Sequence, residues 1–186
     1  MNLIDMNAND IRMCIDGKDM EMKYPICYGK VYDSWLVSKC GKVWSLKRNK
    51  LLTGGKRRSY AYSKNCFTKR GVLYTITTKK DWWEDGSGFG FSLIVDKSGN
   101  SKVYYQRHIT AHKMVMDTWA PLYDNPPEGM VWEEWEIARD LPSVYNHISK
   151  TVVIDHIDDD PMINHIDNLR RVTSWDNQSS RKAKGI

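Results

Sequence analysis

The sequence predicts an α+β protein: an antiparallel, β-rich N-terminal part, then a helix, then a C-terminal unit of two strands and a helix. Three observations predict this class. Runs of β-branched and aromatic residues, separated by turns that contain Gly, fill most of residues 25–106. Apolar residues then recur at helical spacing over residues 108–120. The last third returns to short β-branched runs that precede a capped helix.

The N-terminal residues 1–24 are mixed and polar, and we interpret them as an arm. Within the arm, Ile11 to Ile15 could form a short packing helix, and no chemistry is predicted for it. The rest of the chain divides into a β-rich region, residues 25–106, and a C-terminal domain, residues 107–186.

The first clear β signal is a hairpin. Two alternating runs, residues 34–37 and 42–46, flank Ser38-Lys39-Cys40-Gly41, where Gly supplies the positive φ that a tight turn needs. Further strands are expected over residues 72–78, 89–95 and 102–105, with turns at residues 85–88 and 96–100.

A basic stretch follows the hairpin. Nine cations and no carboxylate lie between residues 47 and 70, interleaved with aromatic residues: Lys47, Arg48, Lys50, Lys56, Arg57, Arg58, Lys64, Lys69 and Arg70. Charges of one sign repel each other, and cations with flat rings suit a phosphate backbone and its bases. We therefore expect a basic loop that contacts nucleic acid, and the alternative is a solvated charged face.

The helix expected over residues 108–120 carries Ile109, Val115 and Trp119 on one face and is ended by Pro121. His112 lies on this face, so we interpret it as a core residue, with contact to a phosphate as the alternative. Residues 122–150 form an acidic insertion, for which partner binding and repulsion of DNA outside the footprint both remain open.

The last third reads as strand, loop, strand and helix. The β-branched residues 152–154 lead into Asp155-His156 at a strand end, and a second run covers residues 169–172. Thr173 or Ser174 can cap the helix that follows, with Asp176 completing a capping box. Asn177 then lies in the first turn and can face the hairpin.

These side chains suit hydrolytic chemistry. A His with an ordinary pKa near 6.5 is partly neutral at pH 7 and can accept a proton from water. Asp and Asn offer oxygen ligands, which hard ions such as Mg²⁺ or Mn²⁺ prefer. His165 has no partner carboxylate at ligand spacing, and we interpret it as a loop residue or a phosphate contact.

The arrangement of Asp155-His156, then Asn168 twelve residues after His156 and Asn177 nine further on, resembles the HNH (His-Me finger) motif of phage homing endonucleases. The resemblance implies a ββα-metal catalytic motif. His156 is then the general base, Asn168 orients its ring, and Asp155 and Asn177 hold one divalent ion, Mg²⁺ or Mn²⁺. The family usually has Gly in the loop, where this chain has Asp159-Asp160-Pro161.

Residues 34–45 are similar to the modular DNA-binding motif that often precedes HNH domains, although a plain β-hairpin without a partner is the alternative. The resemblance implies that residues 25–106 are a DNA-binding region and that residues 107–186 are an HNH nuclease domain. Four further cations are expected to contact the DNA backbone: Arg170, Arg171, Arg181 and Lys182.

Composition sets the remaining bounds. The formal net charge is +5, which fits a polyanionic partner, here double-stranded DNA. The chain has no apolar run long enough to span a membrane and no export signal, so a cytoplasmic location is expected, in the bacterial host if a phage encodes it. The four cysteines include no C-x-x-C pair, and no structural zinc is expected.

The resemblance thus implies a metal-dependent DNA endonuclease of the phage homing type that leaves 3′-hydroxyl and 5′-phosphate ends. Because the chain holds one Asp-His, Asn, Asn set, a monomer is expected to nick one strand. Two alternatives remain: a non-catalytic DNA-binding protein on an HNH scaffold, and a structure-specific or restriction-type HNH nuclease.

Overall fold

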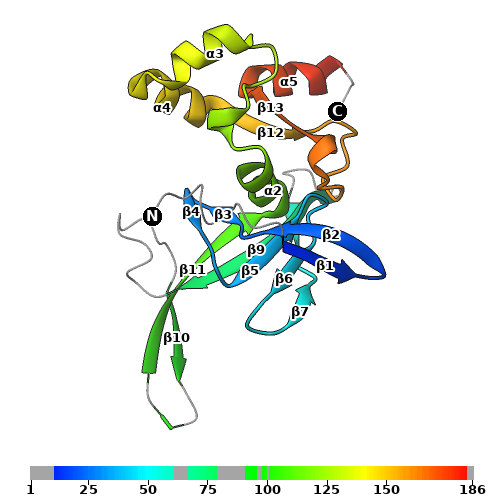
Figure 1. Ribbon diagram of the computed structural model, residues 1–186, viewed down its shortest axis with the longest axis vertical. Helices are drawn as coiled ribbons and strands as arrows, with labels where there is room; N and C mark the ends of the chain where they lie inside the picture. Colours follow the sequence, from blue (N-terminus) through cyan, green and yellow to red (C-terminus); the bar gives the residue numbers. More distant parts are fainter. Residues whose placement is uncertain (1–10, 61–66, 79–90, 96–97, 100, 184–186) are drawn as a thin grey trace.

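The computed structural model describes residues 11–60, 67–78, 91–95, 98–99 and 101–183. As the sequence predicts, the N-terminal part is an antiparallel β structure and helices follow it in the C-terminal part (Figure 1). Helices α4 (Pro142–Thr151) and α5 (Ser174–Ala183) lie at one end of the molecule, and α2 (Ala111–Trp119) lies between them and the two larger sheets (Figure 1). Among the described residues, no helix has the length and apolar character that crossing a membrane requires.

The first sheet has five strands in the order β1-β2-β5-β6-β7, namely Ile11–Ile15, Lys18–Lys23, Trp35–Ser38, Val43–Ser45 and Lys50–Leu52. The short helix expected over Ile11–Ile15 is wrong, because this segment is β1. Asp16 and Gly17 have φ of 54° and 75° and join Ile15 to its partner Lys18. Two consecutive positive φ values match the right-handed twist of a hairpin, and the Asp-Gly pair is its sequence signal.

The hairpin predicted over residues 34–46 is confirmed. Strands β5 and β6 pair from Trp35↔Ser45 to Val37↔Val43, and Gly41 in the turn has φ of 78°. Trp35, Val37 and Val43 are buried, so the hairpin contributes its side chains to the core.

The second sheet has four strands in the order β10-β11-β9-β8, namely Phe91–Val95, Ser101–Thr110, Phe67–Thr78 and Gly55–Tyr60. The strands predicted over residues 72–78, 89–95 and 102–105 are present with shifted bounds. The turn predicted at residues 85–88 lies outside the described residues, and of the turn at residues 96–100 only 98–99 are described.

The basic stretch is not a single loop. Strand β7, strand β8 and the start of β9 occupy much of it, and β8 pairs with β9 from Gly55↔Leu73 to Tyr60↔Phe67. The physical reason is that long cationic side chains can leave a strand toward solvent while its backbone pairs. Lys64 lies outside the described residues.

Helix α2, Ala111–Trp119, begins three residues later than predicted. His108 and Thr110 still belong to β11, where they pair with Thr75 and Leu73 of β9. Helix α2 ends before Pro121, as predicted. Its buried face joins Trp35, Val43, Ile76 and Leu169 in one core cluster. The boundary predicted near residue 106 therefore falls inside β11, and residues from both predicted regions share this core.

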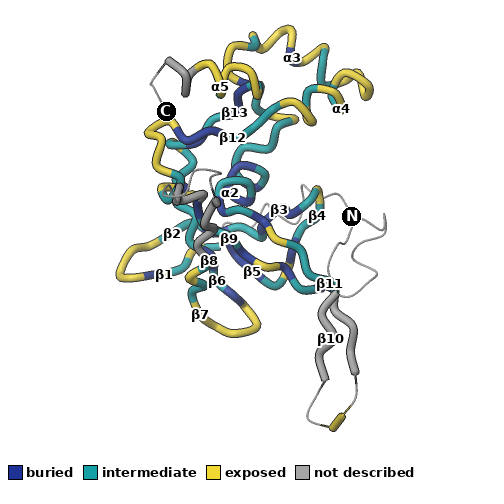
Figure 2. Tube along the Cα trace, turned by 180° about the vertical axis from the view of Figure 1, so that it is seen from behind, coloured by how far each residue is buried: buried dark blue, intermediate teal, exposed yellow. Residues whose placement is uncertain are grey.

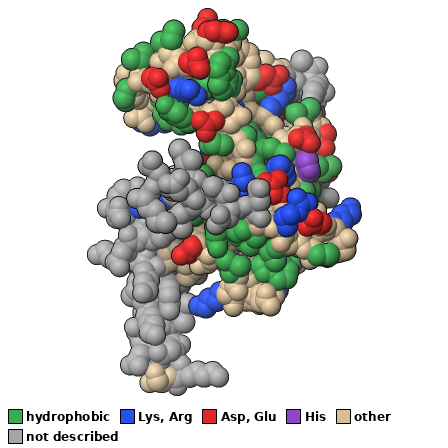
Figure 3. All heavy atoms as spheres, in the orientation of Figure 1, with side chains coloured by type: hydrophobic (Ala, Val, Ile, Leu, Met, Phe, Trp, Pro, Cys, Tyr) green, Lys and Arg blue, Asp and Glu red, His purple; other side chains and the backbone are tan. Residues whose placement is uncertain are grey.

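The acidic insertion folds as a short 3₁₀ turn and two helices: η2 (Leu122–Asp124), α3 (Trp132–Arg139) and α4 (Pro142–Thr151). Trp135 is fully buried, and its Nε1 donates to the Tyr123 carbonyl at 3.1 Å. The outer turns of both helices are exposed (Figure 2). On the face drawn in Figure 3, this end of the molecule carries acidic and hydrophobic side chains.

The last third has the predicted order of strand, loop, strand and helix. Strands β12 (Val152–His156) and β13 (Leu169–Thr173) pair antiparallel, with the turn η3 (Ile166–Asn168) before β13, and helix α5 (Ser174–Ala183) packs on both strands. Strand β3 (Ile26–Cys27) and strand β4 (Lys30–Val31) form a separate small hairpin.

Candidate functional site

Asp155 and His156 are the last two residues of β12, and both are buried, at 7% and 8% exposure. Successive side chains of a strand point to opposite faces. Asp155 accordingly contacts its cross-strand partner Arg170, whereas the His156 ring contacts His112 of α2. The carboxylate and the imidazole are therefore neighbours in sequence that have different surroundings.

The His156 ring is held by Asn164. Its Nε2 lies 3.3 Å from Asn164 Oδ1, and the Asn164 Nδ2 donates to the Met162 carbonyl at 3.1 Å, which sets the orientation of the amide. An amide oxygen only accepts, so a neutral His156 in this pair carries its proton on Nε2. Nδ1 is then the basic nitrogen. Asn164 is itself 5% exposed.

The role predicted for Asn168 is corrected by the structure, because its amide bonds to the loop and not to the imidazole. Its Oδ1 accepts from the Asp158 N–H at 3.1 Å, and its Nδ2 donates to Asp158 Oδ1 at 2.7 Å and to the Ile163 carbonyl at 2.9 Å. The Asn168 bond is the main cause of the lowered pKa of Asp158. Asn168 thus closes the loop between the strands, and Asn164, which the sequence analysis missed, meets the ring.

The loop has its sharp turn at Asp159, with φ of 61°. This is the left-handed region that favours Gly, and Asp tolerates it better than most other residues. Asp160 Oδ1 then accepts from the Met162 N–H at 2.9 Å. The Asp-Asp-Pro segment therefore makes this turn without a Gly.

The β5–β6 turn supports this loop from the N-terminal side. The Ile166 N–H donates to the Lys39 carbonyl at 2.8 Å. A Cβ on Gly41 would lie 3.0 Å from the Asn164 Cβ and 3.2 Å from its carbonyl oxygen. Gly41 is therefore needed both for its φ and for the close approach of Asn164, the residue that holds His156.

His112 packs edge-on against His156, with ring centroids 5.3 Å apart. Its Nε2 bonds to the Thr110 hydroxyl at 2.9 Å, whereas its buried Nδ1 has no hydrogen-bond partner in the described ranges. Burial, with smaller effects of His156 and Lys113, lowers the pKa of His112 to about 4. This ring is therefore neutral at pH 7. It packs against His156, in agreement with the interpretation of His112 as a core residue.

The His112 environment predicts a pH-dependent stability. The unfolded His titrates near 6.5 and the folded one at about 4, so between these values the unfolded chain binds more protons. The contribution of His112 to the free energy of unfolding is complete above pH 6.5 and is lost as the pH falls toward 4. We expect the free energy of unfolding, from urea titrations, to fall by about 2 kcal/mol more from pH 7 to pH 5 in wild type than in His112→Gln. The exposed His147→Gln should keep the wild-type slope, and parallel slopes for all three would contradict the assignment.

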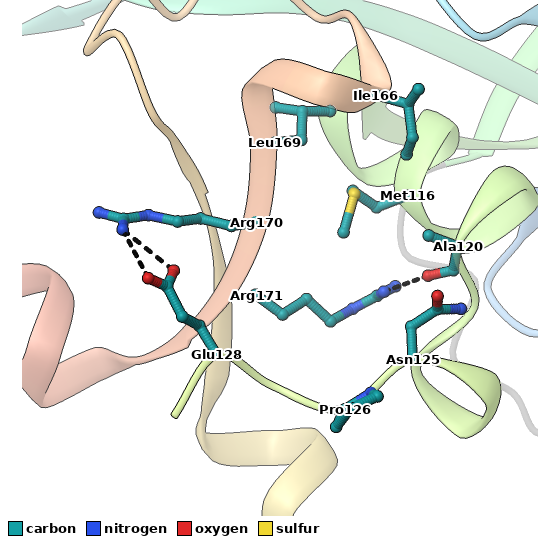
Figure 4. A pocket seen from close by; sticks show the side chains of 9 residues that line it. All are labelled: Met116, Ala120, Asn125, Pro126, Glu128, Ile166, Leu169, Arg170 and Arg171. Carbon is teal, nitrogen blue, oxygen red and sulfur yellow. Dashed lines mark hydrogen bonds and ion pairs between the residues drawn. The ribbon is translucent and has the colours of Figure 1, made fainter. Parts of the chain in front are cut away.

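Arg170 and Arg171, predicted to contact DNA, are both engaged inside the protein. The Arg170 guanidinium bonds to Asp155 and, at 3.0–3.1 Å, to the two oxygens of Glu128 (Figure 4). Arg171 is 7% exposed, forms an ion pair with Asp117 at 3.1 Å and donates to the Ala120 carbonyl. The backbone role predicted for Arg171 is therefore wrong, because its side chain is buried.

A cavity of about 290 Å³ lies between α2, β13 and the start of the insertion (Figure 4). Met116 and Leu169 form apolar parts of its wall, and the Arg171 stem crosses it toward Ala120 (Figure 4). Asp155 and His156 do not line this cavity. It is therefore separate from the side chains that carry the predicted chemistry.

Asn177 lies in the first turn of α5, as predicted. The Asp176 N–H donates to Thr173 Oγ1 at 3.1 Å, and the Thr173 hydroxyl donates to the Asp176 carboxylate at 2.5 Å. Thr173 is thus the cap, although Asp176 meets its hydroxyl and not its backbone N–H. The Asn177 Oδ1 is buried and has no hydrogen-bond partner among the residues that the structure describes. Such an oxygen costs about 1–3 kcal/mol unless a water or a cation satisfies it.

The donors available for a metal ion are oxygens. Both Arg170 bonds to Asp155 end on Oδ2, so Oδ1 receives no hydrogen bond from the part of the chain that the structure describes. The Asp155 Oδ1 and the Asn177 Oδ1 are the kind of oxygen donor that a hard divalent ion prefers. Within the described ranges, no group of three or more His, Cys, Asp or Glu could hold a metal. The fit therefore rests on Asp155 and Asn177.

The structure describes the side chains of only some of the other residues that are predicted to contact DNA. Lys47, Arg48 and Lys50 are exposed where β6 passes into β7. On the face drawn in Figure 3, cationic side chains lie mixed with carboxylates beside a His side chain. For the remaining cations only the backbone is described: Lys56, Arg57 and Arg58 in β8, Lys69 and Arg70 in β9, and Arg181 and Lys182 in α5.

Comparisons with known proteins give one distant likeness. No family model and no curated protein matches the chain. One solved structure, "DNA binding and cleavage by the HNH homing endonuclease I-HmuI", matches this chain with 20% identity and a TM-score of 0.42. The likeness covers 89% of this chain and 60% of that one, so this chain spans less than two thirds of the length of I-HmuI.

Proposed function

We propose that this protein is a metal-dependent DNA endonuclease of the HNH class, of the phage homing type, that hydrolyses phosphodiester bonds in double-stranded DNA. One observation carries the proposal. At the end of β12, a His with a basic Nδ1 directly follows an Asp, and the helix that packs on the hairpin carries Asn177. Within the described part of the chain, the Asp155 Oδ1 and the buried Asn177 Oδ1 receive no hydrogen bond. A base and oxygen ligands for a hard cation are what phosphodiester hydrolysis needs.

The chemistry follows from these groups. His156 Nδ1 takes a proton from a water molecule, and the water oxygen bonds to phosphorus as the bond from phosphorus to the 3′ oxygen breaks. Protonation of the leaving oxygen by solvent gives the 3′-hydroxyl, and the phosphate stays on the 5′ end. Asp155 and Asn177 would hold a divalent ion, which when bound would supply positive charge for the phosphate and the leaving oxygen. Asn164 keeps the His156 ring in the tautomer that this step needs.

A second candidate is a DNA-binding protein that keeps the scaffold without catalysis. The observation that favours it is the ion pair between Arg170 and Asp155, at 3.0 Å, which neutralises the carboxylate proposed as a ligand. The two candidates differ in one measurable property, the cleavage of DNA in the presence of Mg²⁺ or Mn²⁺.

The proposal is tested with supercoiled plasmid that carries a cleavable site, incubated with the protein and Mg²⁺ or Mn²⁺. Because the chain holds one copy of the site, a bound monomer acts on one strand. We expect open-circle DNA before any linear form, at a rate first-order in protein, and no product with a chelator. DNA binding without cleavage in either metal would support the second candidate. Linear product formed directly, with second-order dependence on protein, would indicate a dimer.

The exposed cations Lys47, Arg48 and Lys50 are expected to contact DNA phosphates. Changing all three to Gln should weaken binding about equally for all DNA sequences. Each lost contact should also lower the slope of log K against log salt by about 0.9. The measurement is fluorescence anisotropy at several salt concentrations. The control is Lys150→Gln on α4, which should leave the slope unchanged, and a loss confined to one DNA sequence would indicate base recognition instead.

A further inference from the structure

A chain of charged side chains connects the insertion to the proposed metal ligand. The Arg170 Nη1 donates to both oxygens of Glu128, at 3.1 and 3.0 Å, and its Nε and Nη2 donate to Asp155 Oδ2, at 3.1 and 3.0 Å. The contact of Arg170 with Glu128 is visible in Figure 4. Glu128 is 42 residues from Arg170 in sequence, so only the fold brings them together.

The backbone around Glu128 holds it at this position. Its N–H donates to the Arg171 carbonyl at 2.7 Å, which attaches the segment to the edge of β13. The residues before it are Pro126 and the buried Pro127, whose rings restrict the backbone. Glu128 is therefore presented to Arg170 by a restrained segment and not by a freely moving loop.

The charges of the three side chains decide what the site offers a cation. Asp155 and Arg170 alone sum to zero, and the remaining ligand, Asn177, is neutral. A neutral site attracts a divalent cation weakly, because little Coulomb energy offsets the loss of its hydration. Glu128 restores one negative charge, and it bonds to Nη1, whereas Nε and Nη2 bond to Asp155 Oδ2. The Asp155 Oδ1, which receives no bond from the described residues, then stays available.

We propose that Glu128 is a positioning and charge-compensating residue, which acts through Arg170 to keep the Asp155 carboxylate oriented and the site anionic for a divalent ion. The inference rests on the proposed function, since it takes Asp155 as a ligand. It assigns to the acidic insertion a direct connection to the site. Groups that orient and balance ligating carboxylates typically change metal affinity by about 10–100-fold when they are removed.

The test measures Mn²⁺ binding directly, from the electron paramagnetic resonance signal of free Mn²⁺, without DNA. We expect Glu128→Gln, which keeps the shape and loses the charge, to raise the Kd for Mn²⁺ about tenfold. The double variant Glu128→Gln with Arg170→Met again has a net charge of −1 in this group, so most of the affinity should return. The control is Glu134→Gln, an exposed carboxylate on α3, which should bind Mn²⁺ like wild type.

The outcomes separate this inference from the proposed function. A Kd for Glu128→Gln equal to that of wild type, or a double variant as weak as the single one, overturns the role of Glu128 while the nuclease proposal stands. If Asp155→Ala binds Mn²⁺ as well as wild type, Asp155 is not a ligand. This result would contradict both the role of Glu128 and the proposed metal-dependent nuclease function. Thermal unfolding in a chelator, with equal Tm for all variants, shows that the differences in affinity do not come from misfolding.

Discussion

Replacing His156 by Ala is expected to lower the rate of DNA cleavage by about 10²–10⁴-fold, the usual contribution of a general base, while the affinity for DNA stays at the wild-type level. The reason is that His156 supplies the basic Nδ1 and its ring is buried against His112 and Asn164. The exposed cations that are expected to bind DNA are not touched by this change. Single-turnover cleavage and anisotropy binding measure the two effects separately.

The matched control for this variant is His165→Ala. His165 lies nine residues further along the same loop, its side chain is 44% exposed, and its Nδ1 accepts from the Asp167 N–H at 3.2 Å. Because it caps a 3₁₀ turn and does not meet the His156 ring, cleavage should stay within a few-fold of wild type. Equal loss in both variants would mean that the loop, and not the His156 base, limits the rate.

Asp155→Ala and Asn177→Ala are expected to raise the Mg²⁺ concentration for half-maximal cleavage by about 10–100-fold, since each removes one oxygen from a site with two protein ligands. Metal titrations of the cleavage rate measure this shift. Unchanged titrations in both variants would remove the ligand assignment.

Asn177 allows a second, independent check by stability. A bound metal stabilises the folded chain by RT ln(1 + [M]/Kd), about 2.7 kcal/mol at a hundred times Kd. Wild type should therefore gain stability when Mg²⁺ is added, and Asn177→Ala should gain much less. In a chelator, Asn177→Ala should lose little stability, because the Oδ1 that it removes has no hydrogen bond to any described residue. A large loss in chelator would make Asn177 a structural residue.

The sequence by itself determined those features that depend on residues close together in the chain. The Ser38–Gly41 turn, the Thr173 cap and the strand end at Asp155-His156 lie where local chemistry predicts them. A positive φ, a side-chain oxygen before a helix, and a β-branched run that meets polar residues each act within a few residues.

The contacts of the site were decided only by the tertiary structure. Asn164 and Asn168 are both loop amides, and the path of the loop decides that Asn164 meets His156 while Asn168 bonds to Asp158. Adjacent arginines also differ, because alternate residues of β13 face opposite sides. Arg171 is therefore buried against Asp117, and Arg170 meets Asp155.

The contacts that support the site also depend on the tertiary structure. Gly41 approaches Asn164, and Glu128 approaches Arg170, across separations that carry no local signal. Likewise, the helical spacing after residue 107 is overridden up to Thr110 by pairing of β11 with β9. Local propensity is worth less than about 1 kcal/mol per residue, so distant pairing and burial outweigh it. Sequence patterns therefore located the strand end at Asp155-His156, and packing between distant segments decided which groups surround it.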